Sequence, residues 1–403
     1  MSKQVKIEER AEGMSRRGFI TGAAVGAVAL TSLVKNEANA QTTAPATSSP
    51  VNANATPKKS PPLKLEEVLK VAREKLYPRC RVCPECNGDA CAGEVPGFGG
   101  IGSGKAFRNN YDGLARYQFK MRTFHEVKKP DTTVSLWGEK FALPIFAACT
   151  GGTTYNMGLA GKMSEDEFIE AMLFGCKAAD TVCFVADGIG DPLSVYEARL
   201  KAISRSQAKA IAIIKPRTQD EIIKRIRLVE ASGAIAFGID IDSAGRAARA
   251  LPGQTVEPKS LAQLKEIASA SKLPFIIKGV MTVDEAEMAK AAGAAAIVVS
   301  NHGGRVLDHT PATIDALAAI TAKLKGKMLI LVDGGIRYGT DALKCIALGA
   351  DAVLVGRPFV RGAVGGGAEG VALMVNKMKS ELVDSMVLTG VANLKKATRK
   401  ILV

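Results

Sequence analysis

The chain has 403 residues, of which 47% are hydrophobic, 23% charged and 5% aromatic, with 40 Gly and 17 Pro. This composition is typical of a globular protein with a large core, and it excludes disordered, collagen-like and disulfide-rich miniprotein chains. Beyond residue 40 the chain keeps 48 basic and 36 acidic residues, a net charge of +12. Such an excess favours small anionic ligands or an acidic partner, and without interleaved aromatic residues it predicts no nucleic acid binding.

Residues 1–40 resemble a twin-arginine signal peptide. Ser15-Arg16-Arg17-Gly18-Phe19-Ile20 opens an uncharged run that ends at Val34, and Ala38-Asn39-Ala40 has the small residues that a signal peptidase accepts. The apolar run is shorter than the roughly 20 residues that span a bilayer, which favours a cleaved signal over a membrane anchor. The predicted location is therefore the periplasm or the extracytoplasmic face. The twin-arginine route carries folded proteins, which suits a chain that acquires a cofactor before export.

Two further segments precede the main domain. Residues 41–62 are predicted to be a disordered linker, because they are rich in Thr, Ala, Ser, Pro and Asn and show no apolar period. Residues 63–135 are predicted to form an N-terminal helix and a Cys-rich segment.

Residues 136–403 alternate between short apolar runs and helical patterns. Strands are expected at Phe141–Cys149, Thr181–Ala186, Ala210–Lys215, Ala234–Asp240, Pro274–Gly279, Ala295–Asn301, Met328–Asp333 and Ala352–Gly356. Helices are expected between them, at Ser164–Ala179, Thr218–Ser232, Pro258–Ser271, Val283–Ala292, Thr313–Lys325 and Thr340–Leu348. Strands that are apolar throughout are buried on both faces, and eight strand and helix units predict a closed parallel (β/α)8 TIM barrel rather than an open, doubly wound sheet.

Polar residues gather where these strands end. They are Lys215, Asp240, Lys278, Asn301, Asp333 and Arg357. In a parallel barrel the carboxyl ends of all strands meet on one face, where the active site is built. The sequence therefore predicts a single site on that face.

The segment Ser300-Asn301-His302-Gly303-Gly304-Arg305 follows one of these strands. The two glycines allow a ligand to approach the backbone closely, and a neutral imidazole is a suitable base for a hydroxyl proton. Arg305 has the forked donors that bind a carboxylate. We therefore interpret His302 as a catalytic base, while His125 and His309 lack such neighbours and are interpreted as structural.

Two further segments, Asp333-Gly334-Gly335-Ile336-Arg337 and Gly356-Arg357-Pro358, follow the last two strands. This is the usual phosphate position of the barrel, where backbone amides and arginines bind an anion. The pattern predicts a phosphate-bearing cofactor, and a Gly-rich turn with solvated arginines is the alternative. Lys278 could stabilise a ring that gains negative charge on reduction.

Two runs, PFIIKGVMTVDEAEMAKAAGAAAIVVSNHGGRVLD and LVDGGIRYGTDALKCIALGADAVLVGRPFV, resemble the FMN-dependent α-hydroxy-acid dehydrogenase and oxidase family, which includes glycolate and lactate oxidases. The resemblance implies a TIM barrel with FMN, His302 as the base, Arg305 as a carboxylate ligand and Asp240 as the partner of protonated His302. It places Lys278 near the flavin N1 and O2 atoms. The cofactor-binding residues that it implies are Ala147, Ala148, Lys278, Ser300, His302, Gly303, Arg305, Asp333, Gly334, Gly335, Arg337, Gly356 and Arg357.

The chain also departs from the family pattern. The family's Tyr-Tyr-x-Ser-Gly-Ala segment is replaced by a Cys-rich and Gly-rich region, and the family's second arginine after strand four aligns with Ala247. Half of the clamp for the substrate carboxylate is therefore missing. We expect Lys215, Arg246 or Lys105 to compensate, with Lys215 and Arg246 as predicted substrate ligands.

Cys80-x-x-Cys83-x-x-Cys86-x4-Cys91 is the distinctive feature of this chain. The spacing is close to that of iron-sulfur ligands, and a tetrahedral zinc site or two disulfides in an oxidising compartment are also compatible with it. The three alternatives stay open at this level. Cys149, Cys176, Cys183 and Cys345 lie in apolar or helical stretches and are interpreted as inert.

The predicted function is FMN-dependent oxidation of a small, lactate-like L-2-hydroxy acid to the 2-oxo acid, with hydride transfer to flavin N5. The electron acceptor is oxygen, a cytochrome or a quinone, and the resemblance implies a homo-oligomer. One alternative is an FMN barrel with other chemistry, such as isomerisation of a phosphorylated substrate. Another is a non-catalytic exported protein that binds an anion.

Overall fold

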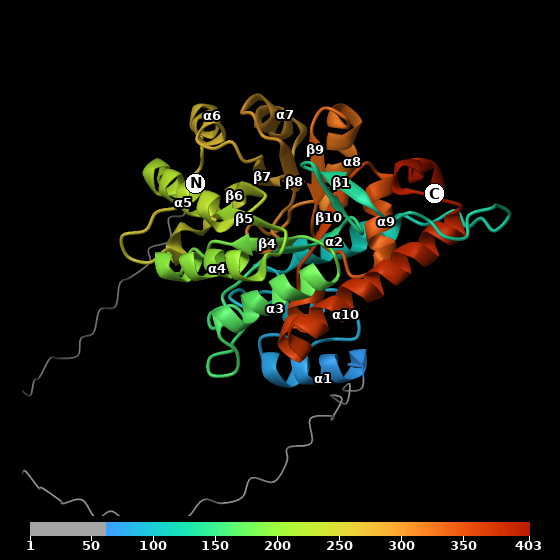
Figure 1. Ribbon diagram of the computed structural model, residues 1–403, viewed down its shortest axis with the longest axis horizontal. Helices are drawn as coiled ribbons and strands as arrows, with labels where there is room; N and C mark the ends of the chain where they lie inside the picture. Colours follow the sequence, from blue (N-terminus) through green and yellow to red (C-terminus); the bar gives the residue numbers. More distant parts are fainter. Residues whose placement is uncertain (1–61) are drawn as a thin grey trace, which may run out of the picture. The chain divides into compact units, whose positions relative to one another are not determined.

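The computed structural model describes residues 62–403, which belong to one compact unit that begins at Ser60. The predicted signal peptide and residues 41–61 of the predicted linker lie outside the described residues. Figure 1 shows a ring of helices around a central sheet. Within residues 62–403, no helix is both long enough and apolar enough to cross a membrane.

The central sheet is a closed barrel of eight parallel strands, which confirms the predicted (β/α)8 TIM barrel. Its strands follow one another around the ring in the order β10, β3, β4, β5, β6, β7, β8 and β9. Their bounds are β3 Ile145–Thr150, β4 Cys183–Ala186, β5 Ala210–Ile214, β6 Ala236–Asp240, β7 Phe275–Val280, β8 Ala296–Val299, β9 Leu329–Val332 and β10 Ala352–Val355. All eight predicted strands are present.

The helices cover the outside of this barrel. They are α3 Glu165–Ala178, α4 Leu193–Ser206, α5 Gln219–Ser232, α6 Leu261–Ser269, α7 Val283–Ala291, α8 Thr313–Leu324, α9 Gly339–Ala347 and α10 Arg357–Thr389. The long α10 is interrupted at Gly366 and Gly367, whose backbone angles are not helical. Short 3-10 helices occur at η1 Asp89–Cys91, η2 Ile241–Arg249, η3 Leu394–Lys396 and η4 Arg399–Ile401.

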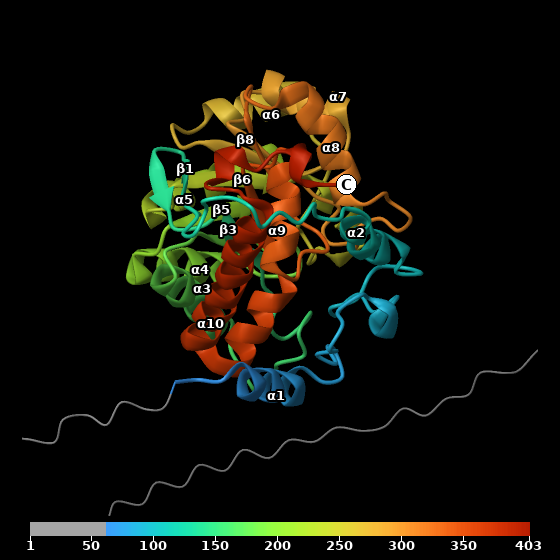
Figure 2. The same ribbon diagram turned by 90° about the vertical axis from the view of Figure 1, so that its right-hand side faces the viewer.

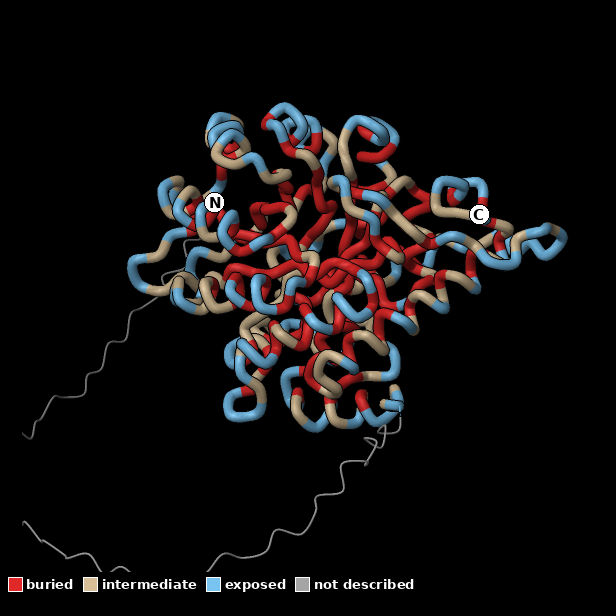
Figure 3. Tube along the Cα trace, in the orientation of Figure 1, coloured by how far each residue is buried: buried red, intermediate tan, exposed pale blue. Residues whose placement is uncertain are grey.

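The core has two layers, and Figure 3 shows the buried residues concentrated in the centre of the molecule. The larger layer lies between sheet and helices, and the smaller one fills the barrel with residues such as Phe146, Phe184 and Ile211. Strands buried on both faces explain why the sequence runs are continuously apolar.

A hairpin closes the amino end of the barrel. It consists of β1 Val134–Leu136 and β2 Glu139–Phe141, and Phe141 packs edge-to-face on Phe146 at 5.3 Å. The predicted first strand Phe141–Cys149 is therefore wrong in extent. Phe141 ends β2, and β3 begins only after Pro144, which has no N–H to donate to a sheet. The predicted domain boundary at residue 136 falls inside β1.

Two helices precede the barrel. Helix α1 Leu65–Leu76 packs across α10, and α2 Lys105–Arg116 packs against α8, as Figure 2 shows. The Cys-rich segment runs between them. Its path brings residues that are far from the barrel in sequence to the rim of the predicted site.

Candidate active site

One large pocket opens at the carboxyl ends of the barrel strands, and it collects most of the predicted site residues. Those that line it are Ala148, Lys215, Arg246, Lys278, His302, Gly303, Arg305, Asp333, Gly334, Gly335, Arg337, Gly356 and Arg357. Ala147 instead packs in the outer layer between sheet and helices. Ser300 and Asp240 are buried in the floor, with exposed fractions of 0% and 1%.

The loop that carries His302 is tied down by side-chain amides. Asn301 donates to Asn110 of α2 at 3.1 Å and accepts from it at 2.8 Å, and both residues are buried. The Ser300 hydroxyl accepts the His302 N–H at 3.0 Å. Gly304 has a φ of 78°, and a Cβ there would lie 2.4 Å from the Phe107 nitrogen. Only glycine therefore allows α2 to dock on this loop.

The imidazole of His302 is held by two carboxylates. Its Nδ1 lies 3.0 Å from Asp242 Oδ1 and 3.5 Å from Asp240 Oδ1. The family resemblance implied Asp240 for this role, and the structure places Asp242, in η2, closer to the imidazole. Burial raises the pKa of Asp242, and nearby Asp240 adds to this while His302 opposes it.

Asp240 is the centre of a buried charge network. Its Oδ2 accepts from Lys215 Nζ at 2.5 Å, and its Oδ1 accepts from Lys278 Nζ at 3.0 Å. Burial alone would raise the pKa of Asp240, but His302 and the two lysines hold it well below its ordinary value. Burial likewise opposes the charge of Lys278, whereas Asp240 and Asp333 hold its pKa well above the ordinary value. We call Lys215, Asp240, Asp242, Lys278 and His302 the base site.

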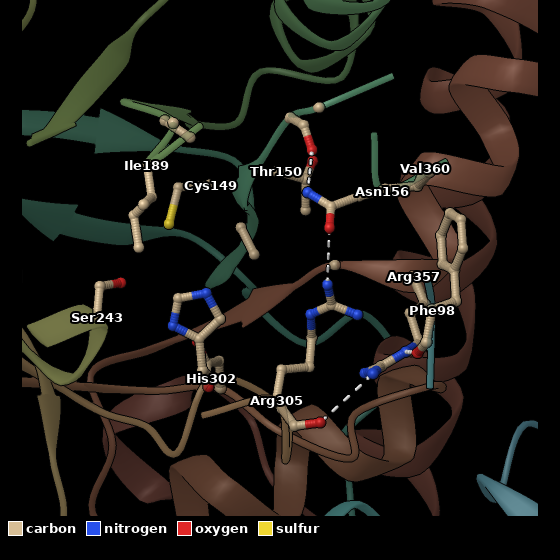
Figure 4. Close-up of a pocket in the computed structure, with 18 of the residues that line it drawn as sticks. Phe98, Cys149, Thr150, Asn156, Ile189, Ser243, His302, Arg305, Arg357 and Val360 are labelled. Atoms are coloured by element: carbon tan, nitrogen blue, oxygen red, sulfur yellow. Dashed lines mark hydrogen bonds between the residues drawn. The ribbon is translucent and has the colours of Figure 1, made fainter. Parts of the chain in front are cut away.

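Arg305 points into the pocket from the loop of His302, and Figure 4 shows its guanidinium directed at Asn156. Arg305 donates to Asn156 Oδ1 at 3.2 Å and to the carbonyl of Gly97. Arg246 in turn donates to the Arg305 carbonyl. The guanidinium is therefore oriented by neutral groups, and its charge has no carboxylate partner among the described residues.

Arg337 and Arg357 both lie against the ring of Phe107. Their guanidinium carbons are 5.5 Å and 4.0 Å from its centroid. Arg357 donates to the Phe98 carbonyl at 2.8 Å, while Arg337 donates to the Cys86 carbonyl at 3.1 Å and keeps a buried Nη2 without a hydrogen-bond partner. The two predicted phosphate ligands are thus brought together, and one donor is unused.

A shared electrostatic property marks these arginines. In the part of the chain that the structure describes, no ion pair involves Arg246, Arg305, Arg337 or Arg357. Burial lowers the pKa of Arg305, and the positive charges of Arg357, Arg246 and Arg249 lower it further. Burial and the neighbouring Arg337 do the same to the pKa of Arg357. We call Arg305, Arg337 and Arg357 the arginine group. Such uncompensated cations favour anionic ligands.

Several residues of the site were not predicted from the sequence. Phe107, Asn110 and Asn156 come from segments that carry no catalytic motif, and Asp242 sits two residues after the strand-end Asp240. The Asp-x-Asp pattern at the end of this strand could have indicated Asp242 as a second acidic residue of the site. The other three became visible only through the packing of α2 and the loop after β3 on the pocket.

The predicted cysteine ligands lie beside the pocket rather than in it. Cys80, Cys83, Cys86 and Cys91 border a separate small cavity, which shares Phe98 and Arg357 with the large one. All four are unpaired.

Comparison with known proteins agrees with this geometry. The family model described as FMN-dependent dehydrogenase matches residues 98–255 and 244–403. Glycolate oxidase 1 of Zea mays is 31% identical over 73% of this chain and 86% of its own length. L-lactate oxidase of Lacticaseibacillus rhamnosus is 33% identical over 67% of this chain and 78% of its own. A crystal structure of mandelate oxidase superposes with a TM-score of 0.68 at 26% identity, covering 84% of this chain and 98% of that one.

Proposed function

Because the chain belongs to the FMN-dependent dehydrogenase family, and is thus an FMN-dependent hydroxy-acid oxidase or dehydrogenase, we propose that it oxidises a small, lactate-like L-2-hydroxy acid to the 2-oxo acid. One observation carries this proposal. A single loop brings an imidazole held by carboxylates into the same pocket as a guanidinium that has no carboxylate partner within residues 62–403. These are the two groups that a hydroxyl proton and a carboxylate require.

The residues present fit FMN. The unpaired Nη2 of Arg337 and the adjacent guanidinium of Arg357 suit its phosphate, and the buried Thr150 hydroxyl in the pocket wall also has no partner. Gly335 has a φ of 79°, and a Cβ there would lie 2.4 Å from the Asn110 carbonyl, so the glycine keeps this wall close to α2. Lys278 contributes an ammonium group in the pocket lining, where a flavin ring would gain negative charge on reduction.

His302 is proposed as the base that takes the substrate hydroxyl proton. With Nδ1–H donated to Asp242, Nε2 carries the free electron pair. Once protonated, the imidazolium is stabilised by Asp242 at 3.0 Å and Asp240 at 3.5 Å. The chemistry that FMN supplies is acceptance of the α-hydrogen as hydride at N5.

Arg305 is proposed to bind the substrate carboxylate, with Arg246 as its second ligand. Lys215, the other predicted ligand, is committed to Asp240 at 2.5 Å and Ser243 at 2.9 Å. Arg246 lines the pocket and has no acidic partner among residues 62–403. It is therefore a better replacement than Lys215 for the family's second arginine, whose position is occupied by Ala247 in this chain. A charged hydrogen bond of this kind contributes about 1.5 to 3 kcal/mol.

Anaerobic mixing with substrate tests the proposal. Purified flavoprotein is mixed with L-lactate, glycolate or mandelate, and the visible absorbance of the flavin is followed. We expect bleaching by at least one of them, fastest with L-lactate. Bleaching by none of the three would reject the hydroxy-acid reaction and favour other flavin chemistry or anion binding without turnover.

Export and assembly stay predictions. We propose that the twin-arginine motif directs the protein to the periplasm, and replacement of Arg16 and Arg17 by Lys should leave the protein in the cytoplasmic fraction. We also propose a homo-oligomer, which the molar mass in solution tests.

A further inference from the structure

The four cysteines between α1 and α2 surround one cavity at the side of the barrel, along the path that Figure 2 shows. Cys80 is buried, whereas Cys83, Cys86 and Cys91 are partly exposed. The same cavity is bordered by Arg357 and Arg361. Four thiols that face one space from a segment of twelve residues are typical of a metal centre rather than of packing.

The distances between the sulfurs bear on which centre fits. In a tetrahedral zinc site with Zn–S bonds of about 2.3 Å, ligand sulfurs lie roughly 3.8 Å apart. Among the residues that the structure describes, no three cysteine sulfurs lie within 4.8 Å of one another. The four sulfurs therefore share a cavity without standing as a preformed zinc tetrahedron.

A buried positive charge beside Cys80 favours a metal centre over disulfides. Arg361, only 9% exposed, directs Nη2 at the Cys80 sulfur at 3.7 Å, and its Nε has no hydrogen-bond partner. No carboxylate pairs with Arg361 in residues 62–403. A metal centre held by four thiolates, whether iron-sulfur or zinc, is an anion and would neutralise this cation, whereas disulfides are uncharged and would not.

The backbone around Cys80 is also shaped toward its sulfur. The N–H of Val82 lies 3.5 Å from the Cys80 sulfur, a kind of contact that tunes iron-sulfur clusters. Val82 has a φ of 46°, which is unfavourable for a β-branched residue, and it is buried. The surrounding packing therefore holds this strained conformation, as is common at functional sites.

The cavity adjoins the proposed phosphate end of the FMN site. The Cys86 carbonyl accepts from Arg337 Nε at 3.1 Å, and Phe98 and Arg357 line both cavities. We propose that Cys80, Cys83, Cys86 and Cys91 bind a [4Fe-4S] cluster that carries electrons from the reduced flavin to a one-electron carrier protein. The role as a relay rests on the proposed function, whereas the presence of the cluster does not.

The electrons and protons of this step balance. Oxidation of one hydroxy acid releases two electrons and two protons. The electrons leave singly, so that one cluster iron goes from ferric to ferrous and back for each electron, and two carrier molecules are reduced. The proton held at His302 and the one that arrived with the hydride are released to water.

The first experiment measures the metal itself. Full-length protein is purified without oxygen and assayed for iron, acid-labile sulfide and zinc, and for the electron paramagnetic resonance of the reduced cluster. We expect about four iron and four sulfide per chain. Zinc without iron, or cysteines that react with alkylating reagents only after reduction, would overturn the proposal in favour of zinc or disulfides respectively.

The second experiment tests the relay with Cys83→Ser, with Cys345→Ala as the matched control. Cys345 is a buried cysteine of α9 outside the cluster. Cys83→Ser should lose its iron, keep FMN and its bleaching by hydroxy acid, and reduce cytochrome c at least about tenfold more slowly. The control should match the parent protein in all four readouts. Unchanged cytochrome c reduction by iron-free Cys83→Ser would overturn the relay.

Arg361→Met tests the presence of the cluster in case Cys83→Ser does not fold. We expect it to keep FMN and to show a lower midpoint potential or a lower iron content, because the cluster loses its cation. Failure of the cluster and failure of the proposed function are separable. Iron and sulfide without bleaching by any hydroxy acid reject only the function, and bleaching without iron rejects only the cluster.

Discussion

In the base site, the buried lysines and carboxylates neutralise one another, whereas the arginine group has no acidic partner in the described chain. Lys215 and Lys278 both contact Asp240, at 2.5 Å and 3.0 Å. Arg337 and Arg357 contact carbonyl oxygens and the ring of Phe107 instead. Figure 4 shows His302, Arg305 and Arg357 in one view of the pocket, with Arg305 drawn between the other two.

This difference assigns a different task to each side. Charges that are balanced within the chain hold their geometry without a ligand, which is what a base needs in order to be ready for substrate. Cations without partners are costly when buried, and an anionic ligand removes that cost. We therefore propose that the base site serves chemistry and that the arginine group serves binding.

The largest effect is expected from His302→Ala. Loss of the base should slow flavin reduction by hydroxy acid by a factor of about 10² to 10⁴, while FMN stays bound. Asp242→Asn keeps the imidazole but removes its nearest carboxylate, so its rate should lie between those of the parent and His302→Ala. Stopped-flow absorbance measures both, and near-normal bleaching by His302→Ala would show that another group takes the proton.

Asp240→Asn tests the balance of charge in the base site. Its removal leaves Lys215 and Lys278 buried without their shared partner, which typically costs about 3 to 5 kcal/mol. The apoprotein should therefore unfold at a clearly lower denaturant concentration. Equal stability of Asp240→Asn and the parent would mean that these lysines are not paired in solution.

Arg337→Met, unlike Asp240→Asn, should not destabilise the apoprotein. Removing an uncompensated buried cation should leave its stability unchanged or increased, since no ion pair is broken. FMN affinity should fall about 10- to 200-fold, which corresponds to one charged hydrogen bond of about 1.5 to 3 kcal/mol. Fluorescence titration of the apoprotein with FMN gives the dissociation constant. The control is Arg205→Met on the surface, which breaks only an exposed pair with Glu170.

The smallest effect concerns Asp308, a carboxylate that is satisfied by the chain alone. It accepts from the Ser103 hydroxyl at 2.7 Å and from the Ala106 N–H at 3.1 Å, at the start of α2. Asp308→Asn should cost about 1 kcal/mol, as loss of a helix cap does, with or without FMN.

The stability difference between the parent protein and Asp308→Asn should depend on pH with a defined sign. Burial opposes the charge of Asp308, but the hydrogen bonds from Ser103, Ala106 and His309 lower its pKa well below the ordinary value. Its contribution is therefore complete above the unfolded pKa of about 4 and is lost as the pH falls toward the lower pKa of the folded state. Denaturant unfolding of the parent and of Asp308→Asn between neutral and acid pH should show that the difference in their unfolding free energies becomes smaller at acid pH. A difference in unfolding free energy that grows at acid pH would contradict the lowered pKa of Asp308 in the folded state.

Much of the fold and part of the site could be predicted from the sequence because the signals are local. Each barrel strand is buried on both faces, so it appears as a continuous apolar run, and the residue after the run lies at the strand's carboxyl end. His302, Arg305, Arg337 and Arg357 were found in this way. The exception is the first strand, where Pro144 separates β2 from β3 and the apolar run continues across the break.

Tertiary packing alone decided the rest. The preference of His302 for Asp242 depends on how η2 lies over β7. The contact of Phe107 with Arg337 and Arg357 depends on the position of α2. The commitment of Lys215 to Asp240 joins two adjacent strands. The burial pattern of a strand depends on residues that are neighbours in the sequence, whereas charge balance depends on residues that meet only after folding. The sequence therefore determined where the site lies, and the tertiary structure decided which charged side chains remain available for ligands.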